Sequence, residues 1–121
     1  MSVKQTGRMG EALAAEALEK SGYRIVKRNV YSRYGEVDLI AEGDGCICFV
    51  EVRARQKGSM VCPLESITPA KIRRIVATAL TYLCDHPSGL QPRFDLFAIT
   101  VERGKAVACE HIKGVFDADG Y

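Results

Sequence analysis

The chain has 121 residues, of which 47% are hydrophobic and 26% charged, the balance of an ordinary globular domain. A chain of this length buries roughly two thirds of the surface that it exposes when unfolded, so we expect one domain spanning residues 1–121. Its net charge of +2 is too small to identify a nucleic-acid-binding protein. No apolar stretch approaches the about 20 residues that span a bilayer, which excludes a membrane protein.

The cysteines and the first residues predict a cytoplasmic location. The five cysteines are an odd number without the spacing of a disulfide framework, which indicates free thiols in a reducing compartment. Cys46 and Cys48 are too close together for a common zinc motif, and we interpret them as small apolar residues of a strand. The N-terminal residues include no apolar segment typical of a signal peptide. We therefore expect a cytoplasmic protein.

The first half of the chain predicts one helix followed by three strands. Residues 7–21 contain a run of strong helix formers that ends before Gly22. Three segments rich in β-branched and aromatic residues follow at residues 23–31, 36–41 and 46–55. Turn-forming residues at 32–35 and 42–45 separate them, which predicts an antiparallel meander.

The second half predicts a helix and two more strands. Thr68 is a typical N-cap and Pro69 a typical first helical residue, and apolar residues then repeat with helical spacing as far as residue 85. Strands are expected at residues 93–101 and 106–112. A helix between the third and fourth strands permits a parallel crossover. We therefore predict an α/β fold in the order α-β-β-β-α-β-β, with a central mixed five-stranded sheet and helices packed on its faces.

The second and third predicted strands bring carboxylates together. If residues 42–45 form a two-residue or four-residue hairpin loop, Asp38 faces Phe49 and Glu36 faces Glu51, so that three acids share one face. Asp38 and Glu51 are then diagonal neighbours with Cβ atoms roughly 7 Å apart or less, close enough for one divalent cation to bridge them. A three-residue loop would instead place Asp38 on the opposite face.

Two interpretations of these acids remain open. Both strands are otherwise apolar, and carboxylates packed together there need a cation, a proton or a basic neighbour. A metal site meets this need, and so does an ion-pair patch with Arg53 and Arg55, which share the face of Glu51. Glu11 lies on the stripe of the first helix that faces the sheet, where it either joins the acids or complements the helix dipole.

Basic residues are concentrated in two parts of the chain. Five bases and no acid occur between residues 20 and 33, and six bases and one acid occur between residues 53 and 74. These stretches predict a basic surface that either binds a polyanion or is simply solvated. Tyr31 and Tyr34 border the first stretch and either stack on unpaired bases or are solvated. The candidate contacts with nucleic acid are Arg33, Arg55, Lys57, Arg73 and Arg74.

The fourth predicted strand contains one more charged pair. Arg93 and Asp95 lie on the same face of this strand, with Phe94 between them. We interpret them as a buried ion pair that stabilises the sheet, and a supporting role of Asp95 behind the metal ligands is the alternative. His86 and His111 are far from the acids in sequence and receive no role.

The combined motifs resemble a known family. Asp38 followed by Glu51-Val52-Arg53, with an acidic helix before and a basic helix behind, resembles the PD-(D/E)XK core of restriction endonucleases and archaeal Holliday-junction resolvases. More closely, the chain resembles the YraN family of small bacterial proteins over nearly its whole length. The segments that carry this resemblance are Gly7-x-x-Gly10-Glu11-x-x-Ala14, Asn29, Gly35-Glu36-Val37-Asp38-Leu39-Ile40, Phe49-Val50-Glu51-Val52-Arg53-x-Arg55, Lys71 and Arg93-Phe94-Asp95.

The resemblance implies a three-layer, restriction-endonuclease-like fold and a metal-dependent phosphodiesterase that cleaves DNA, with branched or structured DNA as the expected substrate. By analogy, Asp38, Glu51 and the backbone carbonyl of Val52 would hold Mg²⁺ or Mn²⁺, and Glu11 would act directly or through a water. Such a cation lowers the pKa of a bound water and neutralises charge on the phosphate. Relatives of the resolvase type usually work as dimers, so the resemblance is compatible with a homodimer.

One position departs from the nuclease motif. The full motif has a lysine two residues after the glutamate, whereas this chain has Arg53, whose guanidinium can hold a phosphate but cannot serve as a base. Lys71 either supplies the missing ammonium from the second helix or is solvent-exposed. The alternative function is therefore a catalytically silent nucleic-acid-binding module with the nuclease fold. A domain that binds only proteins would leave the acids unexplained.

Overall fold

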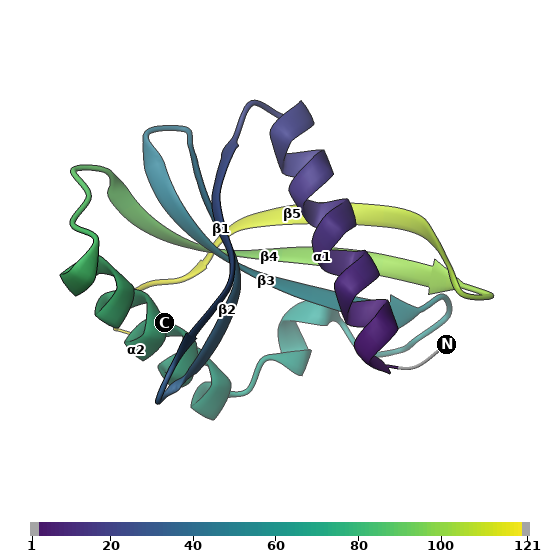
Figure 1. The fold of residues 1–121 in the computed structure, drawn as a ribbon. Helices are drawn as coiled ribbons and strands as arrows, with labels where there is room; N and C mark the ends of the chain where they lie inside the picture. The colour runs from purple at the N-terminus through teal and green to yellow at the C-terminus, as the bar shows by residue number, and fades with distance from the viewer. Residues whose placement is uncertain (1–2, 120–121) are drawn as a thin grey trace.

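The computed structural model of the protein describes the backbone of residues 3–119 and the side chains of residues 9–119. The elements, in chain order, are α1 (Val3–Lys20), β1 (Arg24–Ser32), β2 (Gly35–Gly43), β3 (Cys46–Gln56), the 3-10 helix η1 (Pro63–Ser66), α2 (Pro69–Asp85), β4 (Gln91–Glu102) and β5 (Lys105–Phe116) (Figure 1). The predicted α/β class is confirmed. The addition is η1, which lies where only a loop was expected.

The strands form a mixed five-stranded sheet in the order β1-β2-β3-β4-β5. Strands β3 and β4 are parallel, and the other neighbouring strands are antiparallel. Helix α2 lies in the connection between the parallel strands, because a parallel pair needs a long crossover whereas antiparallel neighbours are joined by short turns. The predicted mixed sheet is confirmed.

A two-residue turn joins β2 to β3 and sets their register. Asp44 and Gly45 have φ values of 54° and 72°, the left-handed conformation that both central positions of this hairpin turn require. Ile40 consequently pairs with Phe49. The predicted register, in which Asp38 faced Phe49, was wrong by two residues. A shift of two residues changes the partners but keeps every side chain on its face.

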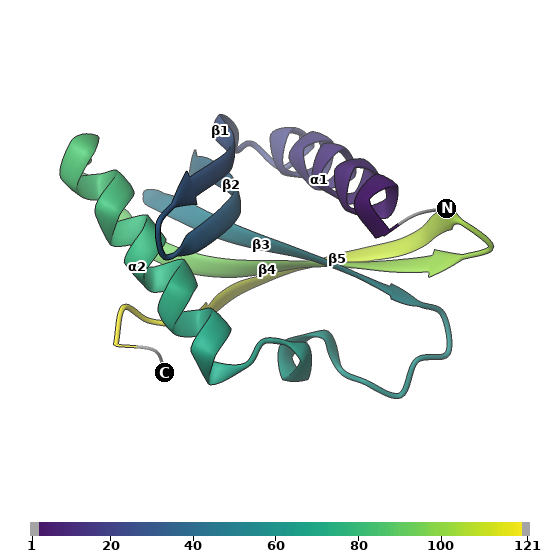
Figure 2. The same ribbon diagram turned by 60° about the horizontal axis from the view of Figure 1, so that its bottom comes forward.

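Apolar side chains form two cores on opposite faces of the sheet. Because alternate residues of a strand share a face, β3 contributes Cys48 and Val50 to the core beneath α1, and Ile47 and Phe49 to the core beneath α2. Figure 2 shows α1 on one side of the sheet and η1 on the other. The helices therefore pack on the faces of the sheet, as predicted.

The element boundaries differ from the predictions mainly at the two ends of the chain. Helix α1 begins at Val3 rather than at residue 7. Strand β5 continues to Phe116, four residues beyond its predicted end at residue 112. The extension has a packing reason, since the buried Phe116 ring stacks on Phe94 with centroids 5.0 Å apart.

Cys46 and Cys48 pack as the sequence predicts for free thiols in a strand. All five cysteines are free thiols; Cys48 is buried in the core beneath α1, and Cys46 packs against that core. This packing is what small apolar residues of a strand show.

Between residues 3 and 119, no helix has both the length and the apolar composition that crossing a membrane requires.

Candidate functional site

Strands β2 and β3 hold two buried carboxylates next to each other. Asp38 is 8% exposed and Glu51 is 5% exposed. The paired register of β2 and β3 ends at Leu39 with Val50, and the two acids are the next residues on either strand. The predicted proximity of Asp38 and Glu51 is thus retained, although the register that predicted it was shifted. Glu36, which was predicted to face Glu51, is exposed to solvent and pairs with β1 on its other side.

The regular alternation of β2 is interrupted at Asp38. Val37 and Ile40 both pack in the core beneath α2, whereas Leu39, between them, packs beneath α1. On the neighbouring strand β1, Asn29 has a φ of 53°, a left-handed conformation that asparagine adopts more readily than most residues. Such irregularities re-aim side chains and are frequent next to functional sites.

Asp38 has no cationic partner among the side chains of residues 9–119. Its Oδ2 accepts a hydrogen bond from the backbone N–H of Val52 at 2.8 Å, and it forms no ion pair with any residue that the structure describes. Burial raises the pKa of Asp38 to about 7, and the nearby charge of Glu51 adds to this rise, whereas the Val52 hydrogen bond opposes it only in part. The carboxylate is therefore open to a proton or a cation.

Glu51 carries the positive partners of the site. Lys71 Nζ lies 3.0 Å from Glu51 Oε1, and Arg53 Nε lies 3.4 Å from the same oxygen. The hydroxyl oxygen of Thr68, the N-cap of α2, accepts the backbone N–H of Lys71 at 3.2 Å, which fixes where α2 starts relative to β3. An ion-pair patch thus exists on Glu51, with Lys71 in the place that the sequence suggested for Arg55.

Glu11 approaches the pair from α1. It is half-buried, and its side chain is hydrogen-bonded to Asn29. Burial raises the pKa of Glu11 and the Asn29 hydrogen bond opposes the rise, while the charges of Glu36 and Glu51 add to it. Sequence reasoning included Asn29 only in the family motif. The available signal was an asparagine, a residue that tolerates positive φ, in a β-branched and basic strand.

The predicted nucleic-acid contacts divide into two groups. Arg55 donates a hydrogen bond to the carbonyl of Val61 at 2.9 Å, and Lys57 Nζ lies 3.5 Å from a carboxylate oxygen of Glu102, so both have partners within the protein. The remaining three line one open groove, together with Tyr34: they are Arg33, Arg73 and Arg74. The structure therefore brings three of the five predicted residues together.

A second charged cluster lies on the α1 side of the sheet. Asp95 accepts hydrogen bonds from Arg93 Nε at 2.9 Å and from the Gly114 N–H at 3.0 Å, and His111 Nε2 lies 2.7 Å from its Oδ2. Burial alone would raise the pKa of Asp95, but these hydrogen bonds outweigh it and lower the pKa to about 2. The predicted Arg93–Asp95 ion pair is confirmed. His111, which no sequence signal connected to it, completes the cluster.

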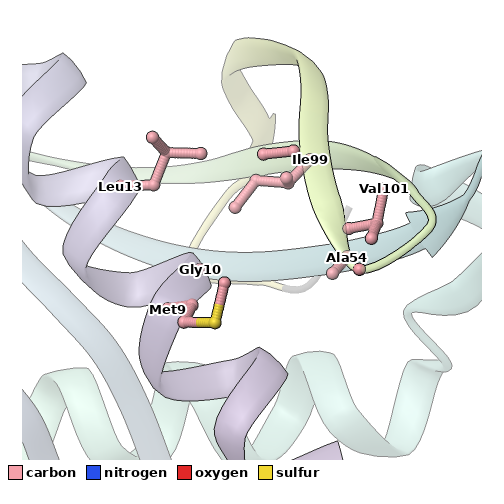
Figure 3. A pocket seen from close by; sticks show the side chains of 8 residues that line it. Met9, Gly10, Leu13, Ala54, Ile99 and Val101 are labelled. Atoms are coloured by element: carbon pink, nitrogen blue, oxygen red, sulfur yellow. The ribbon is translucent and has the colours of Figure 1, made fainter. Parts of the chain in front are cut away.

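An apolar pocket of about 110 Å³ lies between α1 and the β4–β5 hairpin (Figure 3). The described residues that line it carry no ionisable side chain; they include Met9, Gly10, Leu13, Ala54, Ile99 and Val101. These residues supply no group for acid–base or nucleophilic chemistry. The Asp38–Glu51 pair is the stronger candidate for a chemical site.

The Asp38–Glu51 pair suits a small divalent cation. Mg²⁺ is usually bound through one or two carboxylates and keeps several waters, so a third acidic ligand is not required. Among the residues described, no group of three His, Cys, Asp or Glu side chains is arranged to hold a metal. Two buried carboxylates on adjacent strands, one of them without a cationic partner among the described side chains, are nevertheless the donors that such a cation prefers. The residues therefore fit the cation implied by the sequence motifs.

Comparison with known proteins places this arrangement in one family. The family described as Uncharacterised protein family UPF0102 matches residues 10–99, which include both acid-bearing strands. A UPF0102 protein of Myxococcus xanthus is 42% identical over 95% of this chain and 91% of its own length. The corresponding values are 44%, 93% and 94% for a UPF0102 protein of Persephonella marina, and 52%, 69% and 66% for one of Dichelobacter nodosus. The chain therefore belongs to the UPF0102 family, the YraN family that its motifs resemble.

Proposed function

We propose that this protein is a metal-dependent phosphodiesterase that cleaves DNA and has a restriction-endonuclease-like fold. The observation that carries the proposal is the buried Asp38–Glu51 pair with Lys71 Nζ 3.0 Å from Glu51 Oε1. Carboxylates that hold a cation, next to a group that can bind or protonate a phosphate oxygen, are what metal-assisted hydrolysis needs. The mixed sheet with helices on its faces supports the same proposal.

In this proposal Asp38, Glu51 and the backbone carbonyl of Val52 hold Mg²⁺ or Mn²⁺, and Glu11 contributes directly or through a water. The bound cation supplies Lewis acidity, which lowers the pKa of water and neutralises charge on the phosphate. The protein's own groups orient the carboxylates. The Val52 N–H holds Asp38, and the Asn29 side chain holds Glu11.

Lys71 takes the place of the lysine that the nuclease motif has two residues after the glutamate, where this chain has Arg53. It reaches Glu51 from the first turn of α2, and its position along the helix is held by the Thr68 cap. Its ammonium can bind an oxygen of the scissile phosphate or give it a proton. Arg53 donates a hydrogen bond from its Nη2 to the carbonyl of Ser66 at 3.4 Å, and a guanidinium can bind negative charge but cannot serve as a base.

A second candidate function is a nucleic-acid-binding module without catalysis. The observation that favours it is the double neutralisation of Glu51 by Lys71 and Arg53, which stabilises the carboxylate without a metal. Such a module binds nucleic acid through its exposed bases. Its affinity falls steeply with salt and is indifferent to a chelator.

Calorimetric titration of Mn²⁺ into the wild type and Asp38→Ala, followed by incubation of the same samples with linear and branched DNA, tests the proposal. We expect binding heat in the wild type and none in the variant. We also expect DNA cleavage that requires both the metal and Asp38. Circular dichroism checks that Asp38→Ala is folded.

Glu36→Gln is the matched control for this experiment. It removes an exposed acid two residues from Asp38 in the same strand, so the variant should bind Mn²⁺ and cleave DNA like the wild type. Cleavage that persists in Asp38→Ala would refute the assignment of the site. A wild type that binds DNA but not Mn²⁺ would favour the silent module.

A further inference from the structure

An open groove of about 530 Å³ separates the tip of the β1–β2 hairpin from α2. Figures 1 and 2 both show this tip beside the first half of the helix. Two contacts fix the walls relative to each other. Ser32 Oγ lies 2.8 Å from Thr78 Oγ1, and the close approach of Arg74 to Gly35 would leave an added Cβ only 3.2 Å from the Arg74 Cβ. Contacts between its two walls therefore hold the groove in place.

The groove presents three guanidinium groups without acidic partners. Among the residues described, no carboxylate lies within ion-pair distance of Arg33, Arg73 or Arg74. Arg73 and Arg74 also lie near the N-terminus of α2, where the helix dipole favours negative charge. An extended polyanion would supply a partner to each of these groups. A nucleic-acid backbone has its charges at the regular spacing that this requires.

The groove also presents an aromatic ring. Tyr34 is 44% exposed, and the guanidinium of Arg33 lies over its ring, 4.9 Å from the centroid. The Tyr34 N–H donates to Ser32 Oγ at 3.0 Å, and Arg33 donates to the Tyr34 hydroxyl at 2.6 Å, so the turn and the side chain are both held. An exposed ring among cations suits stacking on an unpaired base, whereas the bases of a duplex are stacked on one another.

The groove leads to the acid pair. Lys71, which contacts Glu51, lies three residues before Arg74 and therefore on the same side of α2. On the other wall, Gly35 precedes Asp38 by three residues in β2. The groove is thus connected to the two carboxylates along both walls, by about one helical turn of α2 from Arg74 to Lys71 and by roughly 10 Å of extended strand from Gly35 to Asp38.

We infer that this groove binds a single-stranded segment of DNA, with Tyr34 stacked on an unpaired base and Arg33, Arg73 and Arg74 on the neighbouring phosphates. The link to cleavage rests on the proposed function. If that function holds, the preferred substrate is DNA with an unpaired segment beside the bond that is cut.

A fluorescence titration tests the stacking directly. The chain contains no tryptophan, so Tyr34→Trp introduces the only indole, and stacking on a base quenches its emission. The titrant is oligo(dT) in the presence of EDTA. Tyr31→Trp is the matched control, because Tyr31 is 70% exposed on the same hairpin but is not among the residues lining the groove. We expect strong quenching at position 34 and little at 31. Equal quenching would overturn the inference.

Affinity measurements by fluorescence anisotropy separate the ring from the hydroxyl. Tyr34→Ala should weaken binding of oligo(dT) roughly tenfold, whereas its affinity for a blunt duplex should stay within about twofold of the wild type. Tyr34→Phe keeps the ring and should bind oligo(dT) within about twofold of the wild type. If Tyr34→Phe loses as much affinity as Tyr34→Ala, the hydroxyl rather than stacking is responsible and the inference fails.

The two proposals fail in distinguishable ways. The binding assays contain no divalent cation, so their result does not depend on cleavage. If Tyr34→Ala weakens oligo(dT) binding but the wild type never cleaves DNA with Mn²⁺, the proposed function is refuted and the groove is supported. Normal oligo(dT) binding by Tyr34→Ala, in a protein that cleaves DNA, would refute the groove alone. Tighter binding of oligo(rU) than of oligo(dT) would overturn the assignment to DNA.

Discussion

Asp38 is held where its ionised form is disfavoured. The side chain is buried beside Glu51, and the Val52 N–H is its hydrogen-bond donor. An aspartate in an unfolded chain has a pKa of about 3.9, whereas Asp38 in the folded protein has a pKa of about 7. Between these two pH values, ionising Asp38 therefore costs free energy in the folded protein but not in the unfolded chain. Such a perturbation, in a group that also lies near a like charge, is typical of a binding or catalytic position.

Asp38→Asn should stabilise the metal-free protein at neutral and alkaline pH. The folded-state pKa is raised, so the destabilisation by Asp38 is absent below about pH 4, grows as the pH rises, and is complete above about pH 7. At pH 8 we expect a gain of roughly 2 to 4 kcal/mol in the free energy of unfolding. Urea denaturation in EDTA, repeated at pH 4 and pH 8, measures it. Glu36→Gln is the control, and a variant no more stable than wild type at pH 8 contradicts the prediction.

Helix α2 and strand β4 position the charged side chains of the acid pair, the groove and the Asp95 cluster. Helix α2 directs Lys71 to the acid pair and Arg73 and Arg74 to the groove, while Ile75 and Ala79 pack into the core. Strand β4 contributes Asp95, whose carboxylate links β4 to β5 through His111 and the Gly114 amide. Because Asp95 is buried, its charge would be costly without these partners, so the link between β4 and β5 stabilises the fold.

Asp95→Asn should lower the free energy of unfolding by about 3 kcal/mol at pH 7, because Arg93 and His111 lose their shared anionic partner. The folded-state pKa of Asp95 is lowered to about 2, so its contribution is present above about pH 4 and is lost as the pH falls through 2. Denaturation curves between pH 2 and pH 7 should show that the difference in the free energy of unfolding between the variant and the wild type becomes smaller as the pH falls.

Glu16→Gln is the comparison for Asp95→Asn. It breaks the exposed Glu16–Lys20 pair on α1 and should cost less than about 0.5 kcal/mol. Equal effects of the two substitutions would show that the Asp95 cluster contributes no more to stability than a solvent-exposed pair.

The charge distribution of the whole molecule is more basic at the surface than its net charge of +2 suggests. Asp38, Glu51 and Asp95 are the buried charged residues among those described, and all three are acids. The exposed bases are therefore offset by fewer exposed acids than the composition indicates. A surface of this kind attracts polyanions and releases counterions when one binds.

Replacing both Arg73 and Arg74 with Glu should weaken binding of oligo(dT) and make it less sensitive to salt. Each phosphate contact with a single strand adds about 0.7 to the slope of log affinity against log salt, so the slope should fall by roughly 1.4. Anisotropy titrations in EDTA at several KCl concentrations measure both quantities. Lys105→Glu changes an exposed charge at the distant β4–β5 turn and should leave the slope unaltered. An unchanged slope in the double variant would place the phosphate contacts elsewhere.

Local signals in the sequence predict the α/β class, the two long helices, the five strands and the family. Helix α2 was predicted with both boundaries, because its N-cap, its first-turn proline and its apolar spacing are local signals. The proximity of Asp38 to Glu51 followed from a short hairpin, and a shift of two residues in register did not disturb it. The Asp-Gly signal for that register was also present in the sequence, at residues 44 and 45.

Which distant side chains meet could not be predicted from the sequence. Lys71 on Glu51, Asn29 on Glu11 and His111 on Asp95 each join different elements. The groove likewise needs a hairpin and a helix about 40 residues apart in sequence to pack together. Periodicity and turn chemistry act over a few residues and therefore specify elements. Contacts between elements depend on how the helices pack on the sheet, which the burial of both cores determines.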